Sequence, residues 1–153
     1  MKQDSAKPVE VRAEDLLAAF PGVRVDHDNA AYYQGLLERR LVLNQCTECS
    51  TWHHPPRPIC PACWSSAVTP RDVTGSGTVA LVTILRQGPR QTGVDYEGGH
   101  VLVAVELDEQ PGVRVAGTVI GVPAEQIGVG DRVRLVWTDI DGAAPRPDFE
   151  LAQ

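Results

Sequence analysis

The sequence has few aromatic residues, no excess of positive charge and no long hydrophobic run. Aromatic residues make up 5% of the 153 positions, and 20 aspartates and glutamates outnumber 14 lysines and arginines, for a net charge of −6. Proteins that bind single-stranded nucleic acid need a basic groove and aromatic stacking platforms, so a nucleic-acid-binding module is the least favoured interpretation. The apolar run Thr78–Leu85 is far too short to cross a bilayer, so no membrane partner is expected.

The N-terminal region also lacks the apolar core of a secretory signal. Residues 1–10 are polar, which predicts a cytoplasmic protein whose cysteine thiols stay reduced. The chain is 42% hydrophobic and 22% charged, an ordinary globular balance, and its length suits one domain or two small ones. The sequence leaves open whether residues 1–28 are a linker from a larger polypeptide.

Cysteine is scarce, and all four cysteines lie in one short stretch, Cys46, Cys49, Cys60 and Cys63. Two residues between the members of a pair let both thiolates point at one ion, and two such knuckles complete a tetrahedral zinc site. Four thiolates saturate the metal and leave no position for water or substrate, so the zinc is expected to be structural. The alternative is a pair of disulfides, which the missing secretory context disfavours.

The loop between the two knuckles is rich in proline, which stiffens it, and contains His53 and His54. Because the cysteines fill the metal shell, we expect these histidines to be surface or packing residues. His100, beside two glycines at the start of a predicted strand, is the stronger candidate for a functional role. No Ser/His/Asp set and no spare cysteine nucleophile is visible, so no catalytic residue is predicted.

Two helices are predicted before the cysteines. The first covers Glu14–Phe20 and ends at a Pro-Gly pair, and the second begins at Asp28 or Asn29 and continues to about Arg40. Apolar residues at helical spacing make one stripe on the second helix: Tyr32, Tyr33, Leu36, Leu37 and Leu41. Such a stripe usually packs into a core, but a small ribbon offers little core, so a partner surface is the alternative.

From residue 68 onward the pattern changes to strands rich in Val, Ile, Leu and Thr. The predicted strands are Thr78–Leu85, Val101–Leu107, Val113–Ile120, Arg132–Thr138 and the shorter Arg146–Leu151. A helical turn at Pro123–Ile127 separates the third from the fourth, which predicts a five-stranded OB-type Greek-key barrel. Gly75-Ser76-Gly77 predicts a bulge or sharp bend in a long first strand.

The predicted fold is therefore mainly β, with N-terminal helices, a four-cysteine zinc ribbon and an OB-fold barrel. We divide the chain into an arm with a short helix (1–28), a helix plus zinc ribbon (29–67) and the barrel (68–153).

This order of parts, with several motifs, resembles the zinc-ribbon/OB-fold acyl-CoA-associated family, also called domain of unknown function 35. The most specific motif is P-P-R-P-I-C-P-A-C at residues 55–63; others are Y-Y-Q-G-L at 32–36, L-V-L-N-Q-C-T-E-C at 41–49 and softer strand matches at 75–79, 103–108 and 129–133. The resemblance covers residues 29–151. Trp64 departs from it, since many relatives have glycine after the last cysteine.

The resemblance implies an accessory subunit. Members assemble with thiolase-like enzymes that act on acyl-CoA thioesters, and in steroid side-chain catabolism they pair with a thiolase-fold retro-aldolase, a carbon–carbon lyase. Other members lie beside MaoC-type enoyl-CoA hydratases. On this resemblance we expect a non-catalytic zinc-binding subunit, no turnover by this chain alone, and a symmetric heterotetramer with a thiolase-like dimer.

A second interpretation is direct binding of the acyl-CoA. Arg39, Arg40, Arg57 and Arg71 give the ribbon region a positive bias, and guanidinium groups suit the phosphates of coenzyme A. Of these, Arg39, Arg40 and Arg57 are the candidate phosphate ligands. The alternative is a solvated or partner-facing patch. The predicted partner surface comprises the helix stripe at Tyr32, Tyr33, Leu36 and Leu37, the loop Trp52–Pro58, and an outward set on the first barrel strand, Ala80, Val82 and Ile84.

Overall fold

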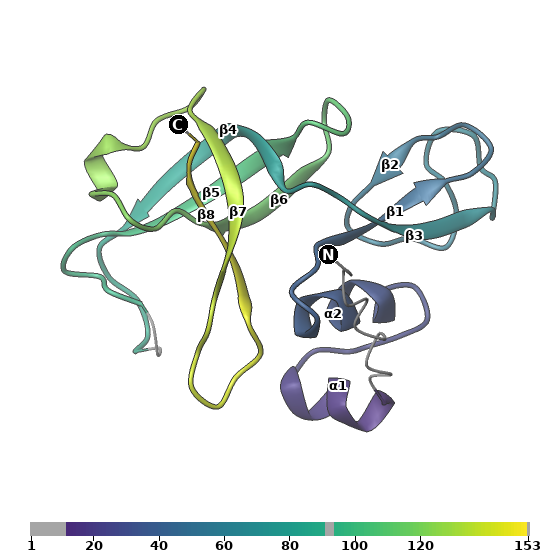
Figure 1. Cartoon of the computed structure of the whole chain (residues 1–153), viewed down its shortest axis with the longest axis horizontal. Helices are drawn as coiled ribbons and strands as arrows, with labels where there is room; N and C mark the ends of the chain where they lie inside the picture. The colour runs from purple at the N-terminus through teal and green to yellow at the C-terminus, as the bar shows by residue number, and fades with distance from the viewer. Residues whose placement is uncertain (1–11, 91–93, 153) are drawn as a thin grey trace, which may run out of the picture.

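The structure, a computed structural model, describes residues 12–90 and 94–152, and its strands form two separate sheets (Figure 1). The first part of the predicted arm, residues 1–11, lies outside the described residues. The elements are α1 (Ala13–Ala19), α2 (Ala30–Leu37), β1 (Val42–Cys46), β2 (Trp52–His53), β3 (Val68–Asp72), β4 (Ser76–Leu85), β5 (His100–Leu107), β6 (Arg114–Thr118), a short 3₁₀ helix η1 (Ala124–Gln126), β7 (Arg132–Thr138) and β8 (Arg146–Leu151). This order confirms the mainly β prediction.

Both predicted helices form, but α2 ends before Arg40. Arg39 adopts a left-handed backbone (φ 53°), and the backbone N–H of Arg40 donates to the carbonyl of Gly35 at 2.8 Å, which closes the helix. Helix α1 packs beside α2 through Phe20 and Tyr33, whose ring centroids lie 4.9 Å apart. None of the helices in the part of the chain that the structure describes has the length and apolar character of a membrane span.

The smaller sheet is the ribbon, with strand order β2-β1-β3 and antiparallel pairing throughout. Its third strand, β3, begins at Val68, so the expected division at residues 67 and 68 falls before the last ribbon strand. Leu41 and Leu43, at the start of β1, are 2% and 1% exposed and belong to the same apolar cluster as the barrel side chains. The ribbon and the barrel therefore share one core.

The larger sheet has the order β6-β5-β4-β7-β8 and is curled into a half-barrel (Figure 1). A parallel bridge between Val119 and Phe149 brings the end of β6 beside β8, and η1 connects β6 to β7. This connectivity matches the predicted OB fold. Val105, Val133 and Phe149 are fully buried at its centre.

A β-bulge interrupts the pairing of β4 with β5. Val79 lies opposite Val105, and Leu81 lies opposite Ala104, so Ala80 is the extra residue. Because successive side chains in a strand point to opposite faces, one extra residue exchanges the inner and outer faces beyond it.

The bulge corrects the outward set predicted for this strand. Val82 and Ile84 pack against the barrel core, and Leu81 instead points outward with 53% of its surface exposed. Leu102 on the neighbouring strand β5 is 38% exposed. The exposed apolar side chains of these two strands are thus Leu81 and Leu102.

Two glycines at the start of β4 allow the chain to pass from the ribbon into the barrel. Gly75 has φ +75°, a conformation that L side chains rarely adopt, and a Cβ on Gly77 would lie 2.3 Å from the carbonyl oxygen of Glu106. Of the two alternatives predicted for this strand, the bulge is present, between Val79 and Leu81 and a few residues beyond the glycines.

Candidate metal centre and the ribbon–barrel junction

The four cysteine sulfurs converge at the tip of the ribbon, all within 4.8 Å of one another. The Sγ atoms of Cys46 and Cys63 lie 3.6 Å apart, as do those of Cys49 and Cys60. A tetrahedral zinc with bonds of about 2.3 Å to sulfur needs edges of about 3.8 Å between sulfurs, so this donor set fits zinc. Bound there, the ion would join the two knuckles and supply no catalytic position.

Each knuckle contributes one inner and one outer sulfur. Cys46 and Cys60 are 1% and 0% exposed, whereas Cys49 and Cys63 lie at the surface. The backbone N–H of Ala62 lies 3.4 Å from Sγ of Cys60, a contact that favours a thiolate. One side of the metal centre is therefore sealed by the protein, and the other faces solvent.

The outer cysteines differ in acidity. Hydrogen bonds with the hydroxyl and the backbone N–H of Thr51 lower the pKa of Cys49 to about 6. The backbone N–H of Ser65 acts to lower the pKa of Cys63, but hydrogen bonds with Cys49 and burial outweigh it and raise that pKa to about 12. Zinc binding would therefore displace a proton from Cys63.

Both knuckles end on a residue with a left-handed backbone. Ser50 follows Cys49 with φ 60°, and Trp64 follows Cys63 with φ 62°. The backbone N–H of Trp64 donates to the carbonyl of Cys60 at 3.0 Å and closes the second turn. Trp64 is 80% exposed.

Arg39 and Arg40, which the sequence proposed as phosphate ligands, each face a carboxylate. Arg39 forms an ion pair with Asp139, and Arg40 contacts Glu38 at 2.6 Å and Asp72 at 2.9 Å. A phosphate at either residue would compete with a carboxylate of the same chain. Their role in coenzyme A binding stays a prediction.

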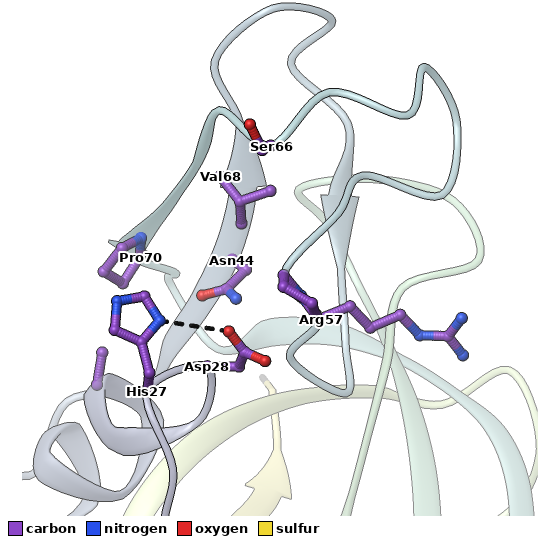
Figure 2. A pocket seen from close by; sticks show the side chains of 9 residues that line it. His27, Asp28, Asn44, Arg57, Ser66, Val68 and Pro70 are labelled. Atoms are coloured by element: carbon purple, nitrogen blue, oxygen red, sulfur yellow. Dashed lines mark hydrogen bonds and ion pairs between the residues drawn. The ribbon is translucent and has the colours of Figure 1, made fainter.

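Arg57 differs from these two arginines, because no carboxylate among the described residues forms an ion pair with it. It lines a cavity of about 140 Å³ together with Asp28 and Asn44, and Figure 2 shows its guanidinium pointing away from Asp28 and His27. It also lines a second cavity, of about 310 Å³, between the ribbon loop and the turn after β5.

His53 and His54 lie in the wall of the second cavity. His53 is 7% exposed, and within the described residues neither of its ring nitrogens has a hydrogen-bond partner; the same holds for Nδ1 of His54. Burial lowers the pKa of both imidazoles, and the charge of Arg57 lowers that of His53 further, so both are neutral at pH 7. The histidines are packing residues, as expected, with unused hydrogen-bonding capacity.

The turn after β5 holds the ribbon against the barrel. The backbone N–H of Trp52 donates to Oε1 of Gln110 at 2.9 Å, and Nε2 of Gln110 donates to the carbonyl of Trp52 at 3.1 Å. Next to it, Glu109 accepts from the backbone N–H of Thr74 at 2.6 Å and from its hydroxyl at 2.9 Å. Sequence reasoning missed this junction because its partners lie 58 and 35 positions apart and carry no local pattern.

Two family models match the chain, one after the other. Residues 34–69 match the ChsH2 rubredoxin-like zinc ribbon domain, and residues 70–138 match the ChsH2 C-terminal OB-fold domain. The chain belongs to the ChsH2 family. A chain of the solved structure described as "Ltp2-ChsH2(DUF35) aldolase" is 30% identical with a TM-score of 0.74, and the match covers 86% of this chain and 99% of that one.

The chain is also similar to curated proteins from a bacterium and an archaeon. A "Probable enoyl-CoA hydratase alpha subunit" of Thermomonospora curvata is 30% identical over 146 residues, which are 95% of this chain and 44% of that protein. A "DUF35 domain-containing scaffold protein" of Pyrococcus furiosus is 35% identical over 95 residues, 61% of this chain and 67% of that protein. The chain thus spans less than half the length of the Thermomonospora relative. A DUF35 structure from Sulfolobus solfataricus, 12% identical with a TM-score of 0.58, shows the same fold.

His100 and the apolar stripe on α2, the two remaining candidates in this ChsH2 family member, both contribute to the packing of the chain. Nε2 of His100 lies 3.2 Å from the hydroxyl of Thr118, which donates to the carbonyl of Val101 at 2.7 Å, so the histidine links β5 to β6. On α2, Leu36 is 6% exposed, and Tyr32 packs against the core and the ring of His54. The helix stripe therefore contributes to the core of this chain, the first of its two sequence interpretations.

Proposed function

We propose that this chain is a non-catalytic, zinc-binding accessory subunit of a thiolase-like acyl-CoA aldolase, a carbon–carbon lyase. The observation that carries the proposal is the match to a ChsH2(DUF35) chain of an aldolase structure over 99% of that chain's length. A likeness that spans both the ribbon and the barrel supports a shared role for the whole unit. The "scaffold protein" description of the archaeal relatives is in keeping with a subunit that supports another enzyme.

Zinc has a structural role in this proposal. The sulfurs of Cys46, Cys49, Cys60 and Cys63 fit a tetrahedral ion, and the four donors leave no open coordination position. The metal holds together a sheet whose strand β2 has only two residues, too short to be stable by pairing alone.

The carbon–carbon bond cleavage is assigned to the partner. All four thiols belong to the metal cluster. The hydroxyl of Thr118, which contacts His100, is buried and donates to the carbonyl of Val101, so this pair offers no accessible nucleophile. The partner we propose is a thiolase-like dimer that binds two of these subunits in a symmetric heterotetramer, acting in steroid or lipid side-chain catabolism. A MaoC-type hydratase is the alternative partner, supported by the description of the Thermomonospora relative.

Co-expression with a thiolase-like subunit tests this proposal. We expect a heterotetramer of fixed stoichiometry, containing one zinc per copy of this chain, that cleaves a β-hydroxyacyl-CoA. The chain alone should show no turnover. Cleavage by the repurified chain alone, or failure to associate with any thiolase-like enzyme, would contradict the proposal.

A second candidate function, direct contact with the acyl-CoA, is favoured by Arg57. Its guanidinium has no carboxylate partner among the described residues, and it lies beside two neutral imidazoles in a cavity of about 310 Å³. Arg57→Ala should raise the KM of the complex for acyl-CoA about tenfold while association and kcat change little. Arg71→Ala, at an exposed arginine on β3, is the matched control and should leave KM unchanged. An unchanged KM for Arg57→Ala would remove this candidate.

The barrel surface does not support nucleic-acid binding, the third interpretation. The exposed large side chains of β4 and β5 are Leu81 and Leu102, which are aliphatic. Single-strand binding by an OB fold relies on aromatic stacking at such positions.

A further inference from the structure

Both knuckles of the metal centre end on a residue with a left-handed backbone, but only the second knuckle has a bulky side chain there. Ser50 and Trp64 occupy equivalent positions, each directly after the second cysteine of its pair, with φ values of 60° and 62°. A left-handed backbone is unfavourable for any residue with a Cβ, and it suits a small polar side chain better than a bulky one. Trp64 is therefore a costly choice for a position that glycine would fill without strain.

The solvent exposure of the Trp64 side chain is a second unfavourable feature, in addition to its backbone conformation. The indole of Trp64 is 80% exposed, and Ile59, just before the same knuckle, is 47% exposed. A single exposed apolar residue is common on protein surfaces. A large aromatic side chain that is both strained and solvated stabilises nothing in the isolated chain, which points to a contact made outside it.

The charge around Trp64 identifies the kind of partner. No lysine or arginine occurs between Arg40 and Arg57 or between Arg57 and Arg71, the segments that contain both knuckles. Glu48 is exposed there, and so are the outer cysteines Cys49 and Cys63. Trp64 directly follows Cys63, and with zinc bound the four thiolates would leave a net negative charge beside the indole. That charge opposes an anionic membrane or a nucleic acid and favours a protein pocket with a basic rim.

We infer that Trp64 is a docking anchor that inserts into an apolar pocket, rimmed by lysine or arginine, on the enzyme subunit that this chain accompanies. This inference rests on the proposed function for the existence of that subunit. Trp64 directly follows Cys63, so a partner that buries the indole also covers the exposed sulfur side of the metal centre. Docking should therefore slow the loss of zinc to a chelator.

The test compares Trp64→Gly with Ser50→Gly in zinc-loaded protein. Both substitutions relieve a left-handed backbone, so each should raise the Tm of the free chain by about 2–4 °C. Only Trp64→Gly should weaken association with the thiolase-like subunit, about thirtyfold or more, which corresponds to about 2 kcal/mol. In the wild-type complex the tryptophan emission should shift to the blue, and the shift should be absent from Trp64→Gly, which keeps Trp52 and Trp137. Ile59→Ser, which leaves the knuckle turn intact, should weaken binding several-fold.

The outcomes separate this inference from the proposed function. If the wild type binds and Trp64→Gly binds equally well, the anchor is overturned and the accessory role stands. If neither the wild type nor Ser50→Gly binds any thiolase-like subunit, the proposed function fails, and the inference fails with it. Two further outcomes would contradict the inference. One is a Trp64-dependent blue shift with vesicles of phosphatidylcholine and phosphatidylglycerol in equal amounts, which would show that the indole binds a membrane. The other is Trp64-dependent self-association, which would show that it binds a second copy of the chain.

Discussion

The ribbon and the barrel depend on different sources of stability. The barrel buries apolar side chains such as Val105, Val133 and Phe149 completely. The ribbon has a small sheet, a buried histidine whose two ring nitrogens have no hydrogen-bond partner in residues 12–90 and 94–152, and four sulfurs where a larger domain would have a core. Apart from Leu41 and Leu43, a segment of this size buries too little surface to fold on apolar contacts alone, so we expect zinc at the four sulfurs to supply much of its stability. On that expectation, one polypeptide combines a metal-dependent half with a half that depends on hydrophobic burial.

Removal of an inner metal ligand should separate the two halves most strongly. Cys60→Ser, at a fully buried cysteine, should abolish zinc binding and unfold the ribbon, because metal affinity is folding free energy in small zinc modules, on the order of 10 kcal/mol. The barrel should keep its β-sheet signals. Elemental analysis and NMR of the purified chain would measure both. Wild-type protein without zinc, or with its cysteines paired as disulfides, would contradict the metal assignment.

A cavity in the barrel core should give the opposite pattern. Phe149→Ala removes a fully buried ring and should lower the free energy of unfolding by about 3–5 kcal/mol while zinc content stays at one per chain. Chemical denaturation measures the loss. Leu81→Ala, at an exposed position of the same sheet, is the control and should cost less than about 1 kcal/mol. Loss of zinc from the Phe149→Ala protein would show that the halves are not independent.

The smallest of these effects should arise at the junction. Gln110→Ala removes two hydrogen bonds to the backbone of Trp52 and should cost about 1–2 kcal/mol, with both halves still folded. Their relative orientation should become less fixed, which residual dipolar couplings would detect as different alignment of ribbon and barrel. Gln126→Ala, at an exposed glutamine on η1, should leave the orientation unchanged. If Gln110→Ala also leaves it unchanged, the shared core around Leu41 and Leu43 is sufficient to hold the halves together.

Local patterns in the sequence predicted much of the fold. Strands β7 and β8 were predicted at the residues where they occur, Arg132–Thr138 and Arg146–Leu151. The convergence of the four sulfurs followed from C-x2-C spacing alone, because a knuckle is a local turn. Zinc binding itself stays a prediction.

What the sequence could not predict depends on contacts between distant segments. The bulge at Ala80 depends on how β4 meets β5, and it reversed the outward set expected from strict alternation. Strand β3 has the exposed residues Thr69, Pro70 and Arg71 and no apolar pattern, so only its pairing with β1 assigns it to the ribbon. The pairing of Arg39 with Asp139 spans 100 positions, and it could not be predicted from the sequence either.

The turn after β5 defines what can be exchanged between relatives. Gln110 binds the ribbon through Trp52, and Glu109 binds the connecting segment through Thr74, although both acceptor residues belong to the barrel. A chimera that joins the ribbon of one relative to the barrel of another would bring together a ribbon and a turn that were not selected as a pair. The modular unit for protein engineering is therefore the ribbon together with this turn, although the two are far apart in the sequence.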